Sequence, residues 1–457
     1  MHVAIVTAGG AGMFCGSCLQ DNALARALTA AGEEISLIPT YTPLTLDTAD
    51  ESLLGPGRGR VFLGGINLYL EHQSKLWGRL PRWLVRVLDS RWALKLSSKL
   101  GVSNDAANLG PLTVDLLRGE EGPQRRGIEE LVDWIVNRLK PDAVAFSNAL
   151  LVGPVRELRK SFDGPVWCTL QGDDIFLDAL KEPHQSAALA MISDRAGDDR
   201  YGFTGFLTHS EYYADHMAET LALPRDRFRT LPLLLAPDGY PEAPPADDER
   251  PPGDAFTVGY FARICPEKGL HNLVDAVALL RERRPEVNWK LLAGGYLGPR
   301  DKRYFRGLRK RTKSWGAGFE YAGAPATLAE KTAILRRFDL LSVPTDYREP
   351  KGLPVLEGWA CGVPCVQPAH GAFPELLAGV PGGVLVEPGD VHALAAAIEE
   401  LHDDPDRRRA LGAAGHVGVR AVHGPAAVAE RFKRILSEPA PAGPAVKEPG
   451  AKEPGAG

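Results

Sequence analysis

The sequence is poor in the features that mark membrane-spanning and secreted proteins. Its 457 residues contain no run of about 18 apolar residues, so we expect no transmembrane helix. Residues 1–7 resemble a short buried strand and lack the charged start and long apolar stretch of a signal peptide. Only six cysteines are present. We therefore expect a cytoplasmic protein whose thiols are reduced.

An excess of charge of one sign is also missing. The formal net charge is −5, so nothing global points to a nucleic-acid partner. Hydrophobic residues make up 44% and charged residues 24% of the chain, as in ordinary soluble globular proteins. The length exceeds one ordinary core and suits two domains of about 200 residues each.

Two cofactor signatures are incomplete. The loop at 8–16 is rich in glycine but holds no strict G-x-G-x-x-G, and no acidic residue clearly ends the next strand, which argues against NAD. Cys15 and Cys18 form a C-x-x-C at a helix start, where the pKa of a thiol falls. No second C-x-x-C completes a four-ligand zinc site. Small buried thiols are therefore favoured, and a thiol oxidoreductase stays an alternative.

Alternating strand and helix patterns predict an α/β protein. Short runs rich in β-branched and aromatic residues occur in the first half at 1–7, 35–39, 143–146, 166–170, 205–208 and 228–231. Residues 244–254 are rich in Pro, Asp and Glu, which is typical of a linker. Further strands are predicted at 256–261, 288–293, 340–343, 363–367 and 383–386. The composition of 439–457 predicts a disordered tail.

Two glutamates flank a predicted helix start. Glu349 and Glu357 are separated by seven residues, and Gly352-Leu353-Pro354 lies between them. Pro suits the first turn of a helix, and Glu357 then sits about one turn inside, with its side chain leaning back toward the N-terminus. The free N–H groups at that terminus form an anion site. Two carboxylates around a phosphate cradle describe a pocket for a sugar nucleotide.

A second motif carries two cations. The predicted strand 256–261 runs into a loop with Arg263 and Lys268, and an amphipathic helix follows from Leu270. Strand, loop and helix form the first unit of a doubly wound domain, whose first loop is where phosphate binds. Arg can grip a phosphate with two hydrogen bonds, and Lys acts as a point charge.

Together the two motifs resemble the E-x7-E and G-R-x-x-x-x-K-G elements of family 4 retaining glycosyltransferases, with Ala262 in place of the usual Gly. The resemblance implies the GT-B fold, in which two Rossmann-like doubly wound domains face a central cleft. Residues 1–243 would bind the acceptor and 255–425 the nucleotide sugar. A helix at 426–438 would cross back onto the first domain.

The resemblance also implies roles for single residues. The leaving diphosphate would be neutralised by Arg263 and Lys268, without a metal ion and without a cofactor other than the UDP-, GDP- or ADP-linked donor. Glu349 would touch the donor sugar and Glu357 the ribose hydroxyls. The residues that cradle the donor are further expected to include Gly352, Leu353, Gly16 and Gln171, with Gly12 as an alternative to Gly16.

The first half departs from the family at Gln171. Many relatives carry T-x-H-G at this place, whereas this chain has Thr169-Leu170-Gln171-Gly172. The amide of Gln171 can still hydrogen-bond a sugar hydroxyl. Asp173 is the nearest group that could accept the proton of the acceptor hydroxyl, and capping of the following helix is an equal alternative.

Residues 58–100 resemble an insertion. They contain nine basic and two acidic residues, with three interleaved tryptophans. A basic helix with tryptophans can lie on the anionic inner face of a membrane. It could equally shape the acceptor pocket, and a helix packed on the first domain with a solvated basic face is slightly favoured.

The expected activity is retaining transfer of a sugar from a nucleotide sugar to a hydroxyl of a glycan, glycolipid or small molecule. Two further alternatives stay open. One is an inactive, membrane-associated scaffold of the same fold, suggested by Gln171. The other is a sugar-nucleotide enzyme of different chemistry, such as an epimerase or a phosphorylase.

Overall fold

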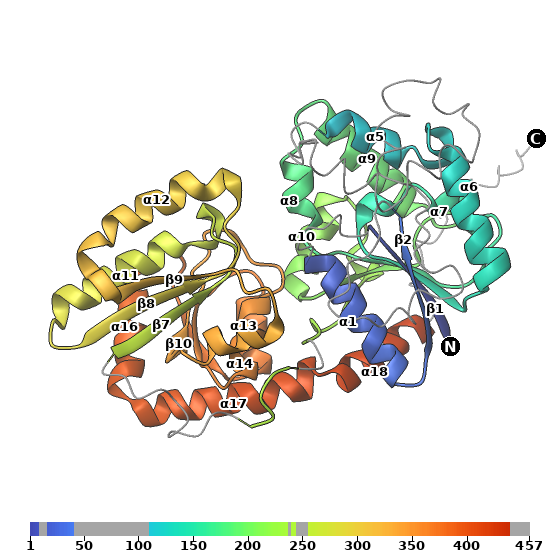
Figure 1. The fold of residues 1–457 in the computed structure, drawn as a ribbon. Helices are drawn as coiled ribbons and strands as arrows, with labels where there is room; N and C mark the ends of the chain where they lie inside the picture. The colour runs from blue at the N-terminus through green and yellow to red at the C-terminus, as the bar shows by residue number, and fades with distance from the viewer. Residues whose placement is uncertain (9–15, 41–108, 236–238, 244–254, 439–457) are drawn as a thin grey trace, which may run out of the picture.

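The computed structural model describes residues 1–8, 16–40, 109–235, 239–243 and 255–438. It contains two α/β domains, each built on a twisted sheet of six strands with helices on its faces (Figure 1). Two helices near the C-terminus, α17 (Pro405–His423) and α18 (Pro425–Ser437), run beneath both domains in the view of Figure 1.

The first sheet has the order β2-β1-β3-β4-β5-β6, and every pairing is parallel. Its strands are almost fully buried, as expected where helices cover both faces of a parallel sheet. They are β1 (His2–Thr7), β2 (Glu34–Pro39), β3 (Ala143–Phe146), β4 (Val166–Thr169), β5 (Gly205–Thr208) and β6 (Phe228–Thr230). The helices of this domain are α1 (Gly16–Ala30), α5 (Gly110–Leu117), α6 (Arg125–Asp133), α7 (Val155–Arg159), α8 (Asp173–Asp178), α9 (His184–Gly197) and α10 (Glu211–Thr220).

The second sheet has the order β12-β11-β10-β7-β8-β9 and is again parallel throughout. Its strands are β7 (Ala255–Phe261), β8 (Asn288–Gly294), β9 (Phe319–Gly323), β10 (Leu340–Leu341), β11 (Cys365–Pro368) and β12 (Gly383–Val386). The helices are α11 (Leu270–Arg283), α12 (Lys302–Arg311), α13 (Leu328–Leu335), α14 (Leu353–Ala360), α15 (Phe373–Gly379) and α16 (Val391–Asp403). The sequence did not predict β9, and β10 is shorter than the predicted strand at 340–343.

Helix α18 belongs to the core of the first domain although it follows the second in sequence. Val428, Phe432 and Ile435 are fully buried in one apolar cluster with Val3 and Leu28. Full burial of an apolar side chain of this size stabilises the fold by about 1.5–3 kcal/mol. The helix expected at 426–438 therefore returns to the first domain and fastens the two domains together.

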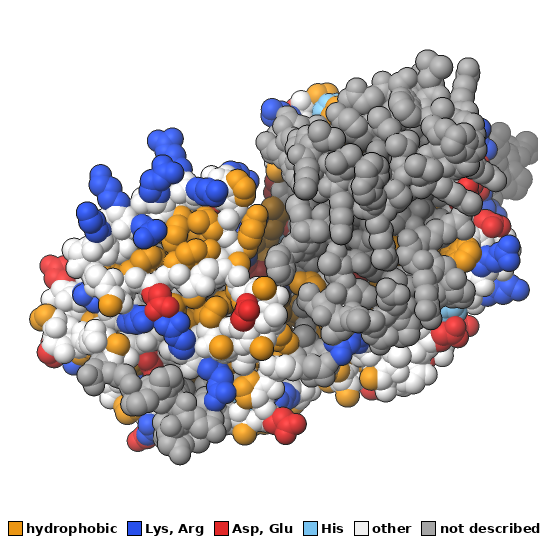
Figure 2. Space-filling view, viewed as in Figure 1, with side chains coloured by type: hydrophobic (Ala, Val, Ile, Leu, Met, Phe, Trp, Pro, Cys, Tyr) orange, Lys and Arg blue, Asp and Glu red, His pale blue; other side chains and the backbone are white. Residues whose placement is uncertain are grey.

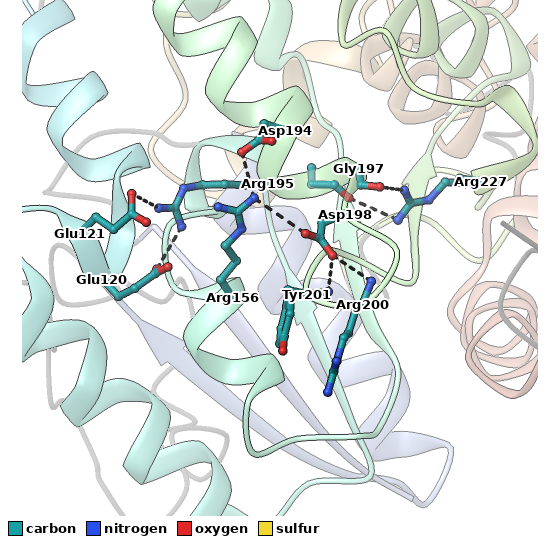
Figure 3. A network of polar contacts seen from close by, with 11 residues as sticks. Glu120, Glu121, Arg156, Asp194, Arg195, Gly197, Asp198, Arg200, Tyr201 and Arg227 are labelled. Carbon is teal, nitrogen blue, oxygen red and sulfur yellow. Dashed lines mark hydrogen bonds and ion pairs between the residues drawn. The ribbon is translucent and has the colours of Figure 1, made fainter. Parts of the chain in front are cut away.

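A network of charged side chains braces the outer helices of the first domain (Figure 3). The guanidinium of Arg195 on α9 is almost fully buried and lies 3.0 Å from Glu120 and 3.5 Å from Glu121. Arg156 on α7 bonds Asp194 at 2.9 Å. Because breaking a buried ion pair leaves one charge uncompensated, this network holds α9 and α7 against the loop at 119–121.

Each sheet contains one point where the strand order reverses. In the second sheet the chain moves outward from β7 to β8 and β9, and then returns to β10 on the other side of β7. In the first sheet the reversal lies between β1 and β3. Ligands of open α/β sheets bind outside the carboxyl ends of the strands at such reversals. These two edges are therefore the places to examine for a site.

Candidate active site

The predicted residues of the second domain gather at its strand reversal. Arg263 and Lys268 follow β7, and Glu349 follows β10, which is the neighbour of β7. The loop with Lys268 is held against the loop that follows β10 because Gly269 (φ 70°) has no side chain to clash with the carbonyl of Pro344. The backbone of this segment thus positions a cation and a carboxylate that lie far apart in the sequence.

Lys268 and Glu349 form a buried ion pair. Their side chains are 19% and 9% exposed, and the ammonium donates directly to the carboxylate. The other oxygen of Glu349 accepts from the backbone N–H groups of Lys351 and Gly352, each at 3.3 Å. Burial opposes ionisation of Glu349, but the Lys268 ammonium and these amides outweigh it and hold its pKa below the usual value. Glu349 therefore accepts from the N-cap amide of α14 and from the amide just before it.

The second glutamate of the motif has partners that the sequence did not indicate. Glu357 is 5% exposed in α14 and accepts from the ammonium of Lys331 at 2.8 Å and from the hydroxyl of Tyr240 at 3.3 Å. Burial and the neighbouring carboxylate raise the pKa of Tyr240 well above its usual value, so it stays a hydrogen-bond donor. Lys331 thus adds a third cation to this side of the sheet.

Arg263 is arranged differently from the two lysines. Its guanidinium is exposed at the carboxyl end of β7 and forms no ion pair with any carboxylate of the described residues. Its backbone carbonyl accepts from the hydroxyl of Tyr260 at 2.9 Å, which fixes the loop. Its guanidinium lies beside the thiol of Cys265, and because no carboxylate of the described residues pairs with it, it can bind an anion.

The first domain contributes Gln171, which follows β4. Gln171 is 7% exposed, and its amide nitrogen donates to Asp21 at 3.0 Å and to the carbonyl of Ser147 at 3.4 Å. Its amide oxygen accepts from the ammonium of Lys351 at 3.4 Å. Since Lys351 lies between the two glutamates of the second domain, this contact joins the two domains at the site.

Asp173 is the first residue of α8, and both of its oxygens accept from the backbone. The donors are the N–H groups of Ala149 and Gln171, each at 2.7 Å. Burial raises the pKa of Asp173 to about 6, although the two amides act in the opposite direction. The side chain therefore holds two loops together, and its role as a proton acceptor stays a prediction.

Asp174 lies at the centre of a second polar cluster, which the sequence analysis did not single out as a site. It accepts from the hydroxyl of Tyr213 at 2.6 Å and from that of Tyr347 at 3.5 Å, and His216 lies 3.6 Å away. Burial opposes its ionisation, but His216 and Tyr213 lower its pKa below the usual value, and Asp174 in turn raises the pKa of His216. Tyr347 belongs to the second domain, so this cluster also spans the two domains.

A further contact clasps the domains beside the site. The carboxylate of Glu375 in α15 accepts from the first two N–H groups of α10, those of Glu211 at 2.6 Å and Tyr212 at 2.7 Å. Ser210 caps the same helix and donates to the carbonyl of Pro350 at 3.1 Å. Anions are stabilised at helix N-termini, so Glu375 stabilises this contact between the domains.

Several predicted features fall outside the described residues. These are Gly12, Cys15, the insertion at 58–100, the linker at 244–254 and the tail at 439–457. Gly16 is the first residue of α1, at the strand reversal of the first sheet. Gly352 is the N-cap of α14 with φ 72°, and Leu353 is the first residue of that helix.

The part of the chain that the structure describes holds no cluster of metal ligands and no membrane-spanning helix. No group of three or more His, Cys, Asp or Glu side chains is clustered there, and none of its helices has the length and apolarity to cross a bilayer. The formal D-x-D at 404–406 lies at a helix start, where Asp404 accepts from the N–H of Arg407 at 2.9 Å. Cys361 and Cys365 are buried free thiols, and burial raises the pKa of Cys361 to about 12.

The partners of the predicted residues were the main omission of the sequence analysis. Lys331, Tyr240 and Glu375 each touch the site or the domain contact beside it from a distant part of the chain. Lys331 lies in a helix with no motif around it, so no local pattern could have indicated its place. Glu375 follows Phe373-Pro374, which predicts a helix start but does not identify its contact with another domain.

The second domain is similar to known protein sequences. Residues 255–404 match the family model described as glycosyl transferases group 1. The chain is 32% identical over 185 residues to a GDP-mannose-dependent monoacylated alpha-(1-6)-phosphatidylinositol monomannoside mannosyltransferase of Corynebacterium glutamicum, which covers 39% of this chain and 46% of the relative. It is 32% identical over 194 residues to a D-inositol 3-phosphate glycosyltransferase of Thermobispora bispora, covering 41% and 44% of the two chains. The matches thus span less than half the length of these relatives.

Comparison with solved structures covers both domains. Sucrose-phosphate synthase from Thermosynechococcus elongatus superposes with a TM-score of 0.65 at 19% identity, over 95% of this chain and 98% of the other. The Anabaena protein HepE, solved in complex with UDP, gives a TM-score of 0.62 at 15% identity, over 96% and 100%. Sequence identities this low support a conclusion about the fold alone. The superpositions confirm the predicted GT-B architecture. The second domain therefore resembles the glycosyl transferases group 1 family, in a chain that folds as a GT-B protein.

Proposed function

We propose that this protein is a glycosyltransferase that moves a sugar from a nucleotide-sugar donor to a hydroxyl acceptor, with retention of the anomeric configuration and without a metal ion. The observation that carries the proposal is the meeting of Arg263, Lys268 and Glu349 at the strand reversal of the second sheet. The matched relatives are named as glycosyltransferases, which supports the reaction class.

The charges at this edge suit a leaving diphosphate. Arg263 has no carboxylate partner among the described residues, and the ammonium of Lys268 has three N–H groups, of which Glu349 takes one. Charge that is held in place before the reaction is usually the largest catalytic contribution. In this proposal the two cations bind the diphosphate while Glu349 accepts from hydroxyls of the donor sugar. Glu357 and Lys331 would hold the ribose.

The acceptor would approach from the first domain. Gln171 and Asp174 face the second domain through Lys351 and Tyr347. In this proposal the acceptor hydroxyl attacks on the same side as the departing diphosphate. Asp173, with its pKa of about 6, has lone pairs beyond the two amide contacts and could take the proton of that hydroxyl. Both relatives are named for inositol-containing acceptors, and we propose a sugar or lipid-linked acceptor, with donor synthesis and transfer in the cytoplasm.

Binding and transfer can be tested separately. Binding is tested with a thermal-shift screen of UDP-, GDP- and ADP-sugars in EDTA. One donor should raise the melting temperature of the wild type, because a ligand that binds the folded state stabilises it. Arg263→Gln should abolish the shift without lowering the stability of the free protein. Arg283→Gln, which removes an exposed arginine at the far end of α11, is the matched control and should keep it.

The reaction itself is tested with the donor that the screen identifies. Transfer to an acceptor in EDTA, with the configuration of the new bond read by NMR, should give a retained anomer. An inverted product would refute retention, and strict dependence on added metal would refute the metal-independent mechanism. Interconversion of the donor sugar without an acceptor would favour an epimerase, and no binding of any donor would favour the inactive scaffold.

A further inference from the structure

Helix α12 presents a strongly cationic face. Of its ten residues, six are Lys or Arg and none is acidic, in a chain with a net charge of −5. Figure 2 shows Lys and Arg side chains gathered over α12, at the upper left of the molecule. The face is formed by Lys302, Arg303, Arg306, Arg309 and Lys310, all of which are exposed.

The helical geometry places these five cations on one side. At about 100° per residue they fall within an arc of about 120°. The opposite side of α12 is occupied by Phe305 and Leu308, which are buried in the core of the second domain. Arg311 points away from the arc and pairs with Asp275 on α11. The orientation of the helix is therefore fixed, and its outer side carries charge alone.

The five cations also lack internal partners. None of them forms an ion pair with a carboxylate of the described residues, whereas the neighbouring Arg300 pairs with Glu267 at 3.5 Å and Arg311 with Asp275. Like charges at i, i+3 and i, i+4 repel one another and destabilise a helix slightly. An external anionic partner would relieve this repulsion.

We propose that α12 docks the protein electrostatically on a membrane surface rich in anionic phospholipid. Clusters of four to eight basic residues on one helix face are typical of such surfaces. Single-stranded nucleic acid fits less well, because none of the exposed large hydrophobic side chains of the described residues lies on α12 to stack with bases. Duplex grooves fit less well too, since the apolar side of α12 is packed in the domain and the helix cannot be inserted.

The position of α12 in the fold links membrane docking to the candidate active site. The helix follows β8, whose carboxyl end lies beside that of β7, and the Arg300–Glu267 pair ties its start to the loop that carries Lys268. A bilayer held by α12 would therefore lie next to the candidate active site. This supplements the proposed function by bringing a lipid-linked acceptor to the donor. Docking itself requires neither donor nor acceptor, so its failure would leave the proposed transfer reaction untouched.

Vesicle co-sedimentation of the full chain tests the proposal. The wild type should bind vesicles of phosphatidylcholine with phosphatidylglycerol, should not bind pure phosphatidylcholine, and should be released by salt. Each basic residue near an anionic bilayer strengthens binding about fivefold, so Arg306→Gln/Arg309→Gln should lower the partition coefficient about thirtyfold. The control Arg407→Gln/Arg409→Gln removes two exposed arginines on α17 that have carboxylate partners and should bind as the wild type does.

Three results would overturn the proposal. These are no preference for anionic over neutral vesicles, an equal loss in the two double variants, and tight retention of nucleic acid by a protein that does not bind vesicles. Equal melting temperatures of both double variants and the wild type would establish that differences in binding reflect the surface and not the fold.

Discussion

The buried pair of Lys268 and Glu349 gives the sharpest prediction. Lys268→Met removes the ammonium and leaves a carboxylate whose side chain is 9% exposed, with only the two long amide contacts of Lys351 and Gly352. Breaking a buried pair in this way costs about 3–5 kcal/mol if the remaining charge persists. Glu349 can avoid part of that cost by binding a proton.

Protonation makes the cost depend on pH. In the wild type the pKa of Glu349 lies below its usual 4.5, so its contribution to stability is present above that value and is lost as pH falls through the lower pKa. In Lys268→Met, burial is no longer opposed by the ammonium and raises the pKa of Glu349. Stability is then present at acid pH and is lost as pH rises above 4.5 toward the raised pKa, with a limiting slope of about 1.4 kcal/mol per pH unit.

The assay is urea unfolding followed by tryptophan fluorescence, since Trp289 and Trp359 are fully buried in the second domain. The difference in unfolding free energy between wild type and Lys268→Met should grow as pH rises above 4.5, by at most about 1.4 kcal/mol per pH unit. Adding Glu349→Gln to the variant should remove this slope. Parallel pH profiles of wild type and Lys268→Met would refute the account of the pair.

Three other changes have defined outcomes. Glu375→Gln leaves one acceptor for two amides of α10, so hydrogen exchange of those amides should quicken about tenfold, and unchanged exchange would show that the clasp is not formed in solution. Burial raises the pKa of Asp173 to about 6, so the contribution of this residue to stability is present at acid pH and is lost as pH rises through 6. Asp173→Asn should remove about 3 kcal/mol of this pH dependence from the free energy of unfolding, measured with urea. Gly352→Ala puts a Cβ at φ 72° and against Leu376, so the melting temperature should fall, and an unchanged value would contradict the fixed start of α14.

The order of strands and helices could be predicted because local patterns carry it. The run Phe256–Phe261 consists of β-branched and aromatic residues apart from one glycine and is buried throughout, as parallel strands covered on both faces are. β9 was missed since Phe-Glu-Tyr-Ala-Gly includes a charge and a glycine, which a half-buried strand at the sheet edge tolerates. β10 ends at Leu341 rather than at 343, and Pro344 follows, which cannot donate to a neighbouring strand.

The candidate site was predictable as a set of residues but not as a set of contacts. Sequence spacing around α14 indicated two carboxylates near one helix start, and both are buried there. It could not indicate that Lys268 would pair with Glu349, because 81 positions separate them. Nor could it place Lys331 against Glu357. Such pairings follow from the order of strands in the sheet, which only the folded chain reveals.

The departure from the family at Gln171 is explained by its surroundings in the fold. Lys351 of the second domain lies 3.4 Å from the amide oxygen of Gln171, and Asp21 of the first domain lies 3.0 Å from its amide nitrogen. A glutamine can satisfy both because it accepts at one end and donates at the other. A histidine in its place would be repelled by the ammonium whenever its ring was charged. The amide of Gln171 therefore suits a position between a cation of one domain and a carboxylate of the other. The presence of Lys351 between the two glutamates of the motif explains why a glutamine stands at position 171.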